Sequence, residues 1–266
     1  MSHLLRIYRA IFVAEFQAAS QYRVQSVLWL LFAIIRPVVF LAAWSAAAAT
    51  QGGQIGDLTI GDFAGYYVAL TLVSQLGMSW NAYDFELEIR QGKLSPKLLR
   101  PLHPLHYSVV ENIVFKVMTL PALLPVLVLV AWTFQARFET TWWHVLLFVP
   151  SMLFAAALRF MFGWLMATVA FWTTRVHGIM HVYDRLVFLF AGQVAPLSLL
   201  GGLSAIAYWL PFGYMLWAPA EILRGGTSLE QTLGMIGIQA AWLALSWLGF
   251  VGLWQLGLRQ YSAVGA

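Results

Sequence analysis

The chain of 266 residues is 61% hydrophobic and 10% charged, with a mean hydropathy of +0.75. Soluble domains are closer to half apolar and a quarter charged, so this composition excludes an ordinary soluble domain. The net charge of +4 is typical of the basic loops that orient membrane proteins, and it does not indicate a nucleic-acid partner. The apolar runs are long and continuous, whereas the strands of an outer-membrane barrel alternate in polarity. The chain has no cysteine, which excludes disulfides and thiolate metal sites.

Residues 3–24 are predicted to form an amphipathic helix that lies in the membrane interface. Apolar side chains recur there every three or four residues, while Arg6, Arg9 and Gln17 fall on another face. A cleaved signal peptide is the competing interpretation, because small residues follow at 46–49. The segment before the first apolar run is about 25 residues long, far longer than the charged start of a signal peptide. The interfacial helix is therefore favoured.

The chain is predicted to be all-α: a polytopic membrane protein whose single transmembrane domain fills residues 1–266. Each crossing needs about 20 predominantly apolar residues. Six spans are expected, at residues 26–50, 63–83, 108–136, 140–174, 183–200 and 231–258. Pro121 and Pro125 are expected to bend the third span. The fourth is unusually long and is predicted as one helix, because no turn residues lie near Arg159.

Residues 203–224 precede the last span and are expected to form broken, re-entrant helices on the outer side. Glycine and proline are dense in this region, which argues against one continuous helix. At membrane depth such a backbone is tolerated only where protein or a water-filled cavity satisfies its polar groups.

The basic residues predict the orientation of the chain. Eleven Lys and Arg fall in the segments expected to face the cytoplasm, and two fall in the outer segments. This bias follows the positive-inside rule. It places both termini in the cytoplasm of a multi-pass protein, which we expect in a bacterial inner or plasma membrane.

The most charged segment lies between the second and third spans, at residues 84–107. Ser95 and Pro96 are predicted to start a short helix, with Ser95 as its cap, and Pro101 to end it. This helix would present Leu98 and Leu99 between basic residues. Such an apolar knob suits insertion into the groove of a partner protein. An ordinary solvated loop is an equally weighted alternative.

Two motifs occur in this segment: Glu-x-Arg-x-Gly-x-Leu at 88–94 and Leu-Leu-Arg-Pro-x-x-Pro at 98–104. Further on, Pro-Leu-Ser at 196–198 and Leu-Pro-Phe at 210–212 interrupt the chain before its last span. Together with the interfacial helix, this order resembles the permease subunits of ABC-2 type exporters over nearly the whole chain.

The resemblance implies an export permease that pairs with a second copy or with a paralogous permease, above a dimer of cytoplasmic ABC ATPases. It implies ATPase-coupling contacts at Glu88, Arg90, Gly92, Leu94, Leu98, Leu99, Arg100 and Pro101. It also implies an extracellular gate region that includes Pro211, Phe212 and Pro219. The chain has no Gly-x-x-x-x-Gly-Lys-Ser/Thr phosphate loop, so ATP and Mg²⁺ are expected on the partner ATPase. No cofactor and no catalytic residue are predicted on this chain, whose other partners would be membrane lipids.

Arg36 and Arg159 lie inside predicted spans. An unpaired arginine at that depth costs about 2.5–3.5 kcal/mol on insertion scales, so each is expected to face the bundle or a cavity. Both are candidates to line a path for anionic or amphipathic cargo, or to meet a subunit interface. A structural role is the alternative, slightly favoured because the sequence identifies no partner for either.

The six histidines do not predict a metal site. His103 with His106 and His177 with His181 have helical spacing, but they are too few for the histidine boxes of a di-iron enzyme. An ion-coupled secondary transporter of small amphipathic substrates is the main alternative function. Such transporters often have internal repeats and midplane acids, which this chain lacks. A membrane enzyme ranks third, because no hydrolase or zinc-protease motif occurs.

Overall fold

Helices form 80% of the computed structural model. It describes residues 2–21, 23–173 and 176–261, with side chains for 4–21, 34–173 and 176–261. Tyr22 in the predicted interfacial helix and Thr174 in the predicted fourth span lie outside the described residues. The helices of 18 residues or more are α1 (Ser2–Ser20), α2 (Arg23–Thr50), α3 (Ile60–Gly77), α6 (Leu105–Thr133), α7 (Trp142–Thr168) and α11 (Leu229–Gln260). The shorter ones are α4 (Asn81–Arg90), α5 (Leu94–Leu98), α8 (His177–Phe190), α9 (Leu203–Trp209) and α10 (Pro211–Arg224).

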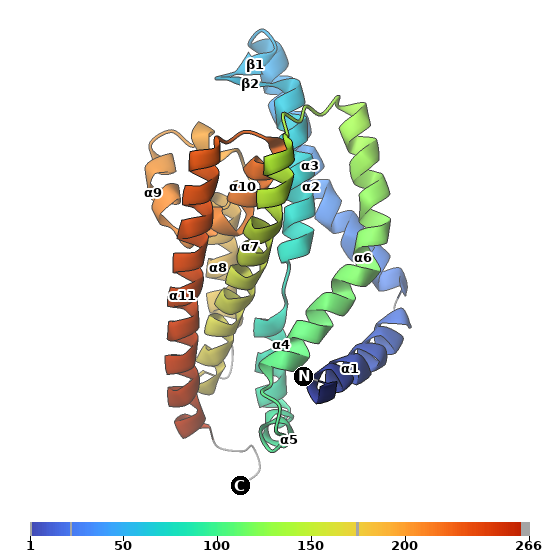
Figure 1. Ribbon diagram of the computed structural model, residues 1–266, viewed down its shortest axis with the longest axis vertical. Helices are drawn as coiled ribbons and strands as arrows, with labels where there is room; N and C mark the ends of the chain where they lie inside the picture. The colour runs from blue at the N-terminus through green and yellow to red at the C-terminus, as the bar shows by residue number, and fades with distance from the viewer. Residues whose placement is uncertain (1, 22, 174–175, 262–266) are drawn as a thin grey trace.

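The molecule is elongated, and its two ends differ (Figure 1). What we call the lower end holds α4, α5, the start of α1 and the last turn of α11. The upper end holds α9 and a small antiparallel hairpin of β1 (Gln54–Ile55) and β2 (Leu58–Thr59), in which Ile55 pairs with Leu58. The chain thus starts and finishes its described course at the lower end.

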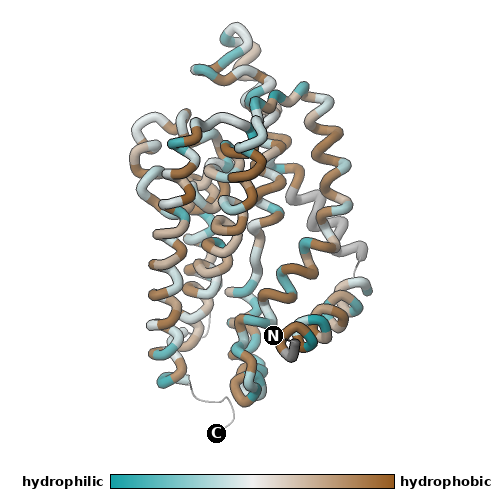
Figure 2. Tube along the Cα trace, viewed as in Figure 1, coloured by the Kyte–Doolittle hydropathy of each residue, from teal (hydrophilic) through white to brown (hydrophobic). Residues whose placement is uncertain are grey.

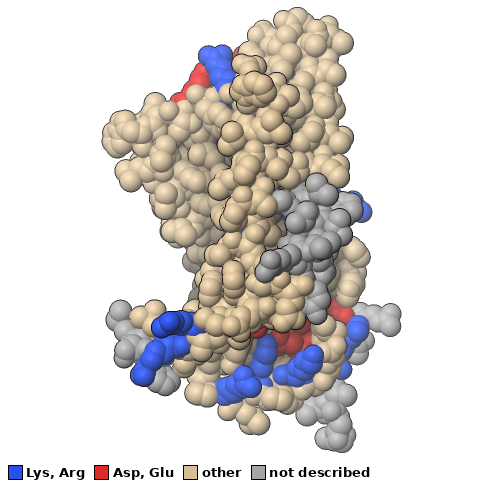
Figure 3. Space-filling model, turned by 90° about the vertical axis from the view of Figure 1, so that its right-hand side faces the viewer, with Lys and Arg blue, Asp and Glu red and all other residues tan. Residues whose placement is uncertain are grey.

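Three described helices are long and apolar enough to cross a membrane: α6, α7 with its continuation to Phe171, and α11. Residues 34–50 of α2 form a shorter apolar helix. Figure 2 shows apolar residues along the middle of these helices and polar residues toward the ends of the molecule. On the face drawn in Figure 3, Lys and Arg gather at the lower end. The all-α, polytopic membrane architecture is therefore confirmed, with three clear spans.

The second predicted span is wrong in its extent, because α3 ends at Gly77 and α4 begins only at Asn81. Met78 between them is extended (φ −64°, ψ 139°). The carbonyl oxygen of Met78, freed from the helix, accepts hydrogen bonds from Asn112 Nδ2 at 2.8 Å and Lys116 Nζ at 3.3 Å on α6. The polar groups of another helix thus stabilise the break, as buried backbone groups require.

The fifth predicted span, 183–200, is also wrong as one helix. Helix α8 starts earlier, at His177, and ends at Phe190, after which Gly192 takes a left-handed conformation (φ 82°) and the 3₁₀ turn η2 (Leu197–Leu199) follows. The carbonyls of Gly192 and Val194 accept hydrogen bonds from Tyr66 Oη and Tyr67 Oη, both at 2.7 Å. The irregular connector is therefore held by side chains of α3.

The remaining long helices follow the predictions. Helix α7 passes unbroken through Arg159 and ends in the 3₁₀ turn η1 (Val169–Phe171). The region before the last helix is broken, as predicted, into α9 and α10, with extended Leu210 between them and Pro211 at the first position of α10. Almost every side chain of α10 is buried, so the surrounding protein satisfies and covers this segment.

Candidate functional site

A cavity of about 490 Å³ lies among α2, α3, α7 and α8. One face of each neighbouring helix forms a wall: residues 70, 71, 74, 75 and 78 on and just after α3, and residues 180, 183, 184, 187 and 188 on α8. Both sets follow helical periodicity. The break between α3 and α4 adds Ser79 and Trp80, so the irregular backbone at 78–80 is itself part of the wall.

Both arginines predicted inside spans line this one cavity. Arg159 comes from the middle of α7, and its Nη1 donates a hydrogen bond of 3.4 Å to the carbonyl of Ser74 on α3. Arg36 comes from α2, and its guanidinium carbon lies 5.3 Å from the centre of the Phe188 ring on α8. The two side chains are 123 positions apart in the chain, yet the bundle directs both to the same space.

Further polar groups line the cavity where α8 begins, near the lower end. Tyr83 Oη on α4 donates a hydrogen bond of 3.2 Å to Asp184 Oδ2 on α8. His181 and Arg185 are exposed neighbours on the same helix. This part of the wall is polar, whereas the part farther along is apolar and contains Leu70 and Val187.

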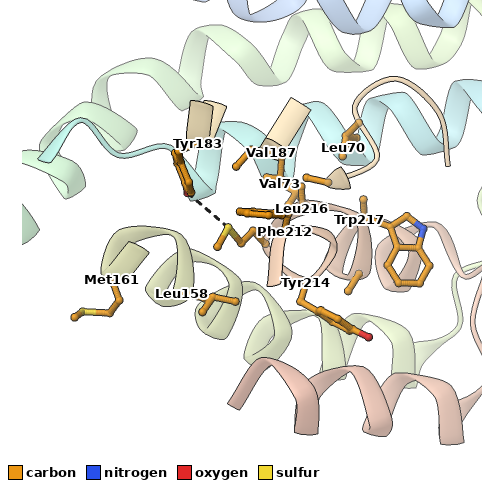
Figure 4. Packing of buried hydrophobic residues seen from close by; sticks show 14 of the residues in the cluster. Leu70, Val73, Leu158, Met161, Tyr183, Val187, Phe212, Tyr214, Leu216 and Trp217 are labelled. Carbon is orange, nitrogen blue, oxygen red and sulfur yellow. Dashed lines mark hydrogen bonds between the residues drawn. The ribbon is translucent and has the colours of Figure 1, made fainter. Parts of the chain in front are cut away.

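The inner wall of the cavity is tightly packed against α10. Figure 4 shows Tyr183, Val187 and Leu70 facing Phe212 and the residues that follow it. The Tyr183 and Phe212 rings meet edge to face with centroids 6.1 Å apart, and Tyr183 Oη donates a hydrogen bond of 3.6 Å to Met215 Sδ. Because protein interiors are close-packed, a shift of α8 at the cavity requires α10 to adjust.

Below the cavity, α4 and α5 form a helical hairpin at the lower end. Gly92 has a positive φ of 67° and makes the tight turn, where a side chain would be strained. The amide of Lys93 closes the turn on the carbonyl of Glu88 at 2.8 Å. The side chains of Glu88 and Lys97 form an ion pair across it. The predicted coupling residues therefore belong to one compact unit, hereafter the α4–α5 hairpin.

The leucines of the α4–α5 hairpin have different environments. Leu94 is fully buried and anchors α5 to the core, Leu98 is half-buried, and Leu99 is 88% exposed. Of the three predicted contact leucines, Leu99 is the one that a partner protein can reach freely. Arg100 and Pro101 are exposed beside it, and Arg100 Nη1 donates to Tyr107 Oη at 3.3 Å.

The predicted cap of the short helix is wrong. Helix α5 begins at Leu94, one residue before Ser95, and Lys93 at its start makes no side-chain cap. The Ser95 hydroxyl instead shares a hydrogen bond of 2.8 Å with Tyr261 Oη, just after α11. A tertiary partner, absent from the local sequence, competes for the hydroxyl that a cap would use.

The sequence pattern of the family described as ABC-2 family transporter protein matches residues 24–265, nearly the whole chain. The chain belongs to the ABC-2 transporter family. This confirms the family predicted from the motifs, and it identifies a membrane transport subunit of a kind that is not itself catalytic and normally works with an ABC ATPase. No curated protein matches the chain.

A buried carboxylate links the α4–α5 hairpin of this ABC-2 protein to the cavity. Glu86 on α4 is 2% exposed. Its Oε2 accepts hydrogen bonds from the Val176 amide at 3.0 Å and from His177 Nδ1 at 2.9 Å, at the start of α8, while Oε1 pairs with Arg90 at 3.2 Å. A carboxylate at a helix N-terminus is stabilised by the free amides and the helix dipole. Glu86 therefore attaches α4 to the helix that forms the opposite cavity wall.

The predicted gate residues of this ABC-2 protein lie together on α10, toward the upper end. Pro211, Phe212 and Pro219 are all buried. Nearby, Arg224 Nη2 pairs with Glu221 Oε2 at 2.7 Å, and Nη1 pairs with Asp62 Oδ1 on α3 at 3.5 Å. This buried cluster ties α10 to α3, so the cavity wall is fastened at both its lower and its upper ends.

Three of the four histidines considered as metal ligands make other contacts. His177 meets Glu86, and His106 Nδ1 lies 2.6 Å from Tyr8 Oη of α1. His103 Nδ1 accepts a bond of 3.1 Å from the Leu105 amide, and its ring packs against Trp254. Over residues 2–21, 23–173 and 176–261, no group of three His, Asp or Glu is arranged to hold a metal ion.

Sequence reasoning missed Glu86, Asp184 and the buried Asp62–Arg224 pair. A charge outside an apolar run gives no sign of its burial, because its partners come from distant parts of the chain. One local signal was available: Glu86 lies four residues before Arg90, a spacing at which opposite charges meet on a helix.

Proposed function

We propose that this chain is the permease subunit of an ATP-driven exporter. Two permeases, either two copies or this chain and a paralogue, form the path across a bacterial inner or plasma membrane. A dimer of separate ATPases binds ATP and Mg²⁺ and contacts the α4–α5 hairpin from the cytoplasm. This chain carries no cofactor of its own.

The observation that carries the proposal is the continuous link from the exposed Leu99 to the cavity. Leu99 follows α5, the Glu88–Lys97 ion pair joins α5 to α4, and α4 leads into the break at 78–80 that lines the cavity. Irregular segments at helix ends are where hinge motions take up changes in φ and ψ. A push on Leu99 would thus rotate α4 about the break and, through Glu86, move α8.

The same arrangement supports six crossings with both termini in the cytoplasm. Helices α2, α6, α7 and α11 run between the two ends, as does α3 together with the extended segment and α4 after it (Figure 1). Helix α8 with the connector after it leads from the lower end back to α9 at the upper end (Figure 1). Helix α8 alone, with 14 residues, spans about 21 Å at helical rise and is too short for the hydrocarbon core. The basic lower end would then face the cytoplasm (Figure 3).

The test is co-purification with the ATPase, using Leu99→Asp and the matched Leu203→Asp. Leu203 is 45% exposed on α9 at the opposite end. We expect wild type and Leu203→Asp to retain a soluble ABC ATPase whose ATP hydrolysis the permease stimulates. Leu99→Asp should lose at least about tenfold in affinity, because truncating an anchor in a partner's groove typically costs about 2 kcal/mol or more.

Two results would contradict the proposal. One is equal ATPase binding by wild type and Leu99→Asp, which would exclude Leu99 as an anchor. The other is transport by the purified chain alone, driven by an ion gradient without any ATPase, which would favour the secondary-transporter alternative.

A further inference from the structure

The charged side chains that line the cavity are mostly basic. Arg36, Arg159 and Arg185 contribute three positive charges, and Asp184 contributes the one negative charge among the lining residues. Asp184 is also engaged, since it accepts the hydrogen bond from Tyr83 Oη. The cavity therefore offers cationic donors, and its single carboxylate is partly satisfied.

Two of these arginines, Arg36 and Arg159, can donate more hydrogen bonds than the protein accepts from them. A guanidinium carries five N–H donors and stays charged. Among the described residues, neither Arg36 nor Arg159 forms an ion pair with a carboxylate. The groups around Arg159 include the Ser74 carbonyl, the Tyr183 hydroxyl and the like-charged Lys116, and Arg36 lies over the face of Phe188. Because charged groups inside a membrane protein are normally paired, an anion is the missing partner.

The rest of the lining is suited to hydrocarbon. Leu70, Met180, Val187 and Phe188 line the same space as the two arginines, with Trp80 at the break. A volume of about 490 Å³ is in the range of pockets that enclose drug-sized ligands. A molecule that satisfies both parts of the wall has an apolar body and an anionic head.

We propose that this cavity binds an amphipathic molecule with an anionic headgroup, which Arg159 and Arg36 hold by charge-assisted hydrogen bonds. This deepens the proposed transport function when the molecule is the exported cargo. A resident anionic phospholipid has the same chemistry and is the second source to be tested. Binding itself needs no ATPase, so failure of ATPase coupling would leave it unchanged.

The test uses the full-length chain in nanodiscs of zwitterionic phosphatidylcholine and three fluorescent probes that share one apolar body: pyrenesulfonate, a pyrenyl trimethylammonium and pyrenemethanol. We expect the sulfonate to bind at least about tenfold more tightly than the other two, since hydrogen bonds to charged groups are worth that factor or more. Arg159→Gln and Arg36→Gln should each weaken sulfonate binding by about tenfold and leave pyrenemethanol binding unchanged.

Arg137→Gln is the matched control, because Arg137 is exposed at the upper end, pairs with Glu139 and does not line the cavity. It should bind the sulfonate like wild type. Arg159→Lys keeps the charge and should keep most of the affinity for the sulfonate. If Arg159→Gln does not fold, Arg159→Lys and Arg36→Gln still test the proposal. Equal affinity for sulfonate and trimethylammonium, or an equal loss in Arg137→Gln, would overturn the proposal.

The source of the anion is decided by repeating the titration in nanodiscs that contain phosphatidylglycerol. A tenfold loss of sulfonate affinity there would support the proposal with a membrane phospholipid as the occupant. Unchanged affinity would support it with a molecule that enters from solution, as cargo does.

Discussion

At the scale of single residues, Glu86 is the most deeply buried charged side chain among the described residues. Its two oxygens serve three partners on two helices, and one of these is the amide of Val176. A buried carboxylate that is fully hydrogen-bonded fixes geometry, because any other arrangement of α4 and α8 would leave it unpaired. Glu86 thus connects the two helices that a coupled motion would have to move together.

Replacing Glu86 by alanine should destabilise the protein by about 1–3 kcal/mol, because the buried amide of Val176 would lose its acceptor. Glu139→Ala is the control, because its pair with Arg137 is more than half exposed and such pairs contribute about 0–1 kcal/mol. Thermal unfolding of both variants in the same detergent measures the difference. Equal loss of Tm in the two variants would contradict the role given to Glu86.

His103 gives a prediction about pH. Burial lowers the pKa of His103 below its usual value, and the nearby His106 adds to the effect. The neutral ring accepts the Leu105 N–H at Nδ1, and protonation of Nδ1 would break this bond. A lowered pKa in the folded state means that the unfolded chain binds the proton more readily. The stability contributed by His103 is therefore present above about pH 6.5 and falls as the pH drops below it.

The stability advantage of wild type over His103→Gln should accordingly shrink between about pH 7.5 and pH 5.5. Thermal unfolding of both proteins across that range measures it. The difference between the two proteins isolates His103 from other titrating groups. A difference that stays constant with pH would show that His103 does not titrate differently in the folded protein.

At the scale of helices, the breaks matter more than the spans. The interruption at 78–80 depends on Asn81, which is 4% exposed and donates to the Phe160 carbonyl on α7 at 2.9 Å. Gly163 makes room for it, since a Cβ at that position would lie 2.2 Å from Asn81 Oδ1. The absence of a side chain at Gly163 therefore allows the break to pack closely against α7.

Gly163→Ala should destabilise the protein by about 1–3 kcal/mol, because the added methyl displaces Asn81 and removes its hydrogen bond. Gly178→Ala is the matched control, because a Cβ there meets open space in the first turn of α8. It should stabilise slightly, by roughly 0.5–1 kcal/mol. In the double variant Gly163→Ala with Asn81→Ala, the clash is gone, so the two losses should be less than additive.

Hydropathy predicted the long helices well and the breaks poorly. Helices α6, α7 and α11 are continuous apolar runs, and the local composition is enough to predict them as helices. The ends of α3 and α8 depend on distant partners: Lys116 on α6 for Met78, and Tyr66 on α3 for the Gly192 carbonyl. The sequence alone could identify Arg36 and Arg159 as candidate site residues, because a charge within an apolar run is costly. That they share one cavity follows only from how the helices pack.

At the scale of the whole molecule, the two ends have different features. The lower end has the exposed Leu99 among basic residues, and the upper end has the buried Asp62–Arg224 pair that fastens α10. The cavity lies between them, with α10 packed behind its wall (Figure 4). This layout suits a protein that receives a push at one end and opens at the other.

The orientation can be tested directly, because the chain contains no cysteine. Single cysteines at Leu99 and at Asp57, in the turn of the β-hairpin, mark opposite ends. A membrane-impermeant maleimide should label Asp57→Cys in intact spheroplasts and Leu99→Cys only in inside-out vesicles. The reverse pattern would place the α4–α5 hairpin outside the cell and exclude contact with a cytoplasmic ATPase.

The most direct test of ATP-driven gating places the cysteine at Ser74, in the wall of the cavity. In the complex with its ATPase, we expect a water-soluble maleimide added from the cytoplasmic side to label Ser74→Cys quickly without nucleotide. Labelling should slow at least about tenfold when a non-hydrolysable ATP analogue closes the ATPase dimer, and Leu99→Asp should abolish this change. A labelling rate that is the same with and without nucleotide, in a complex that still hydrolyses ATP, would contradict the coupling of the α4–α5 hairpin to the cavity.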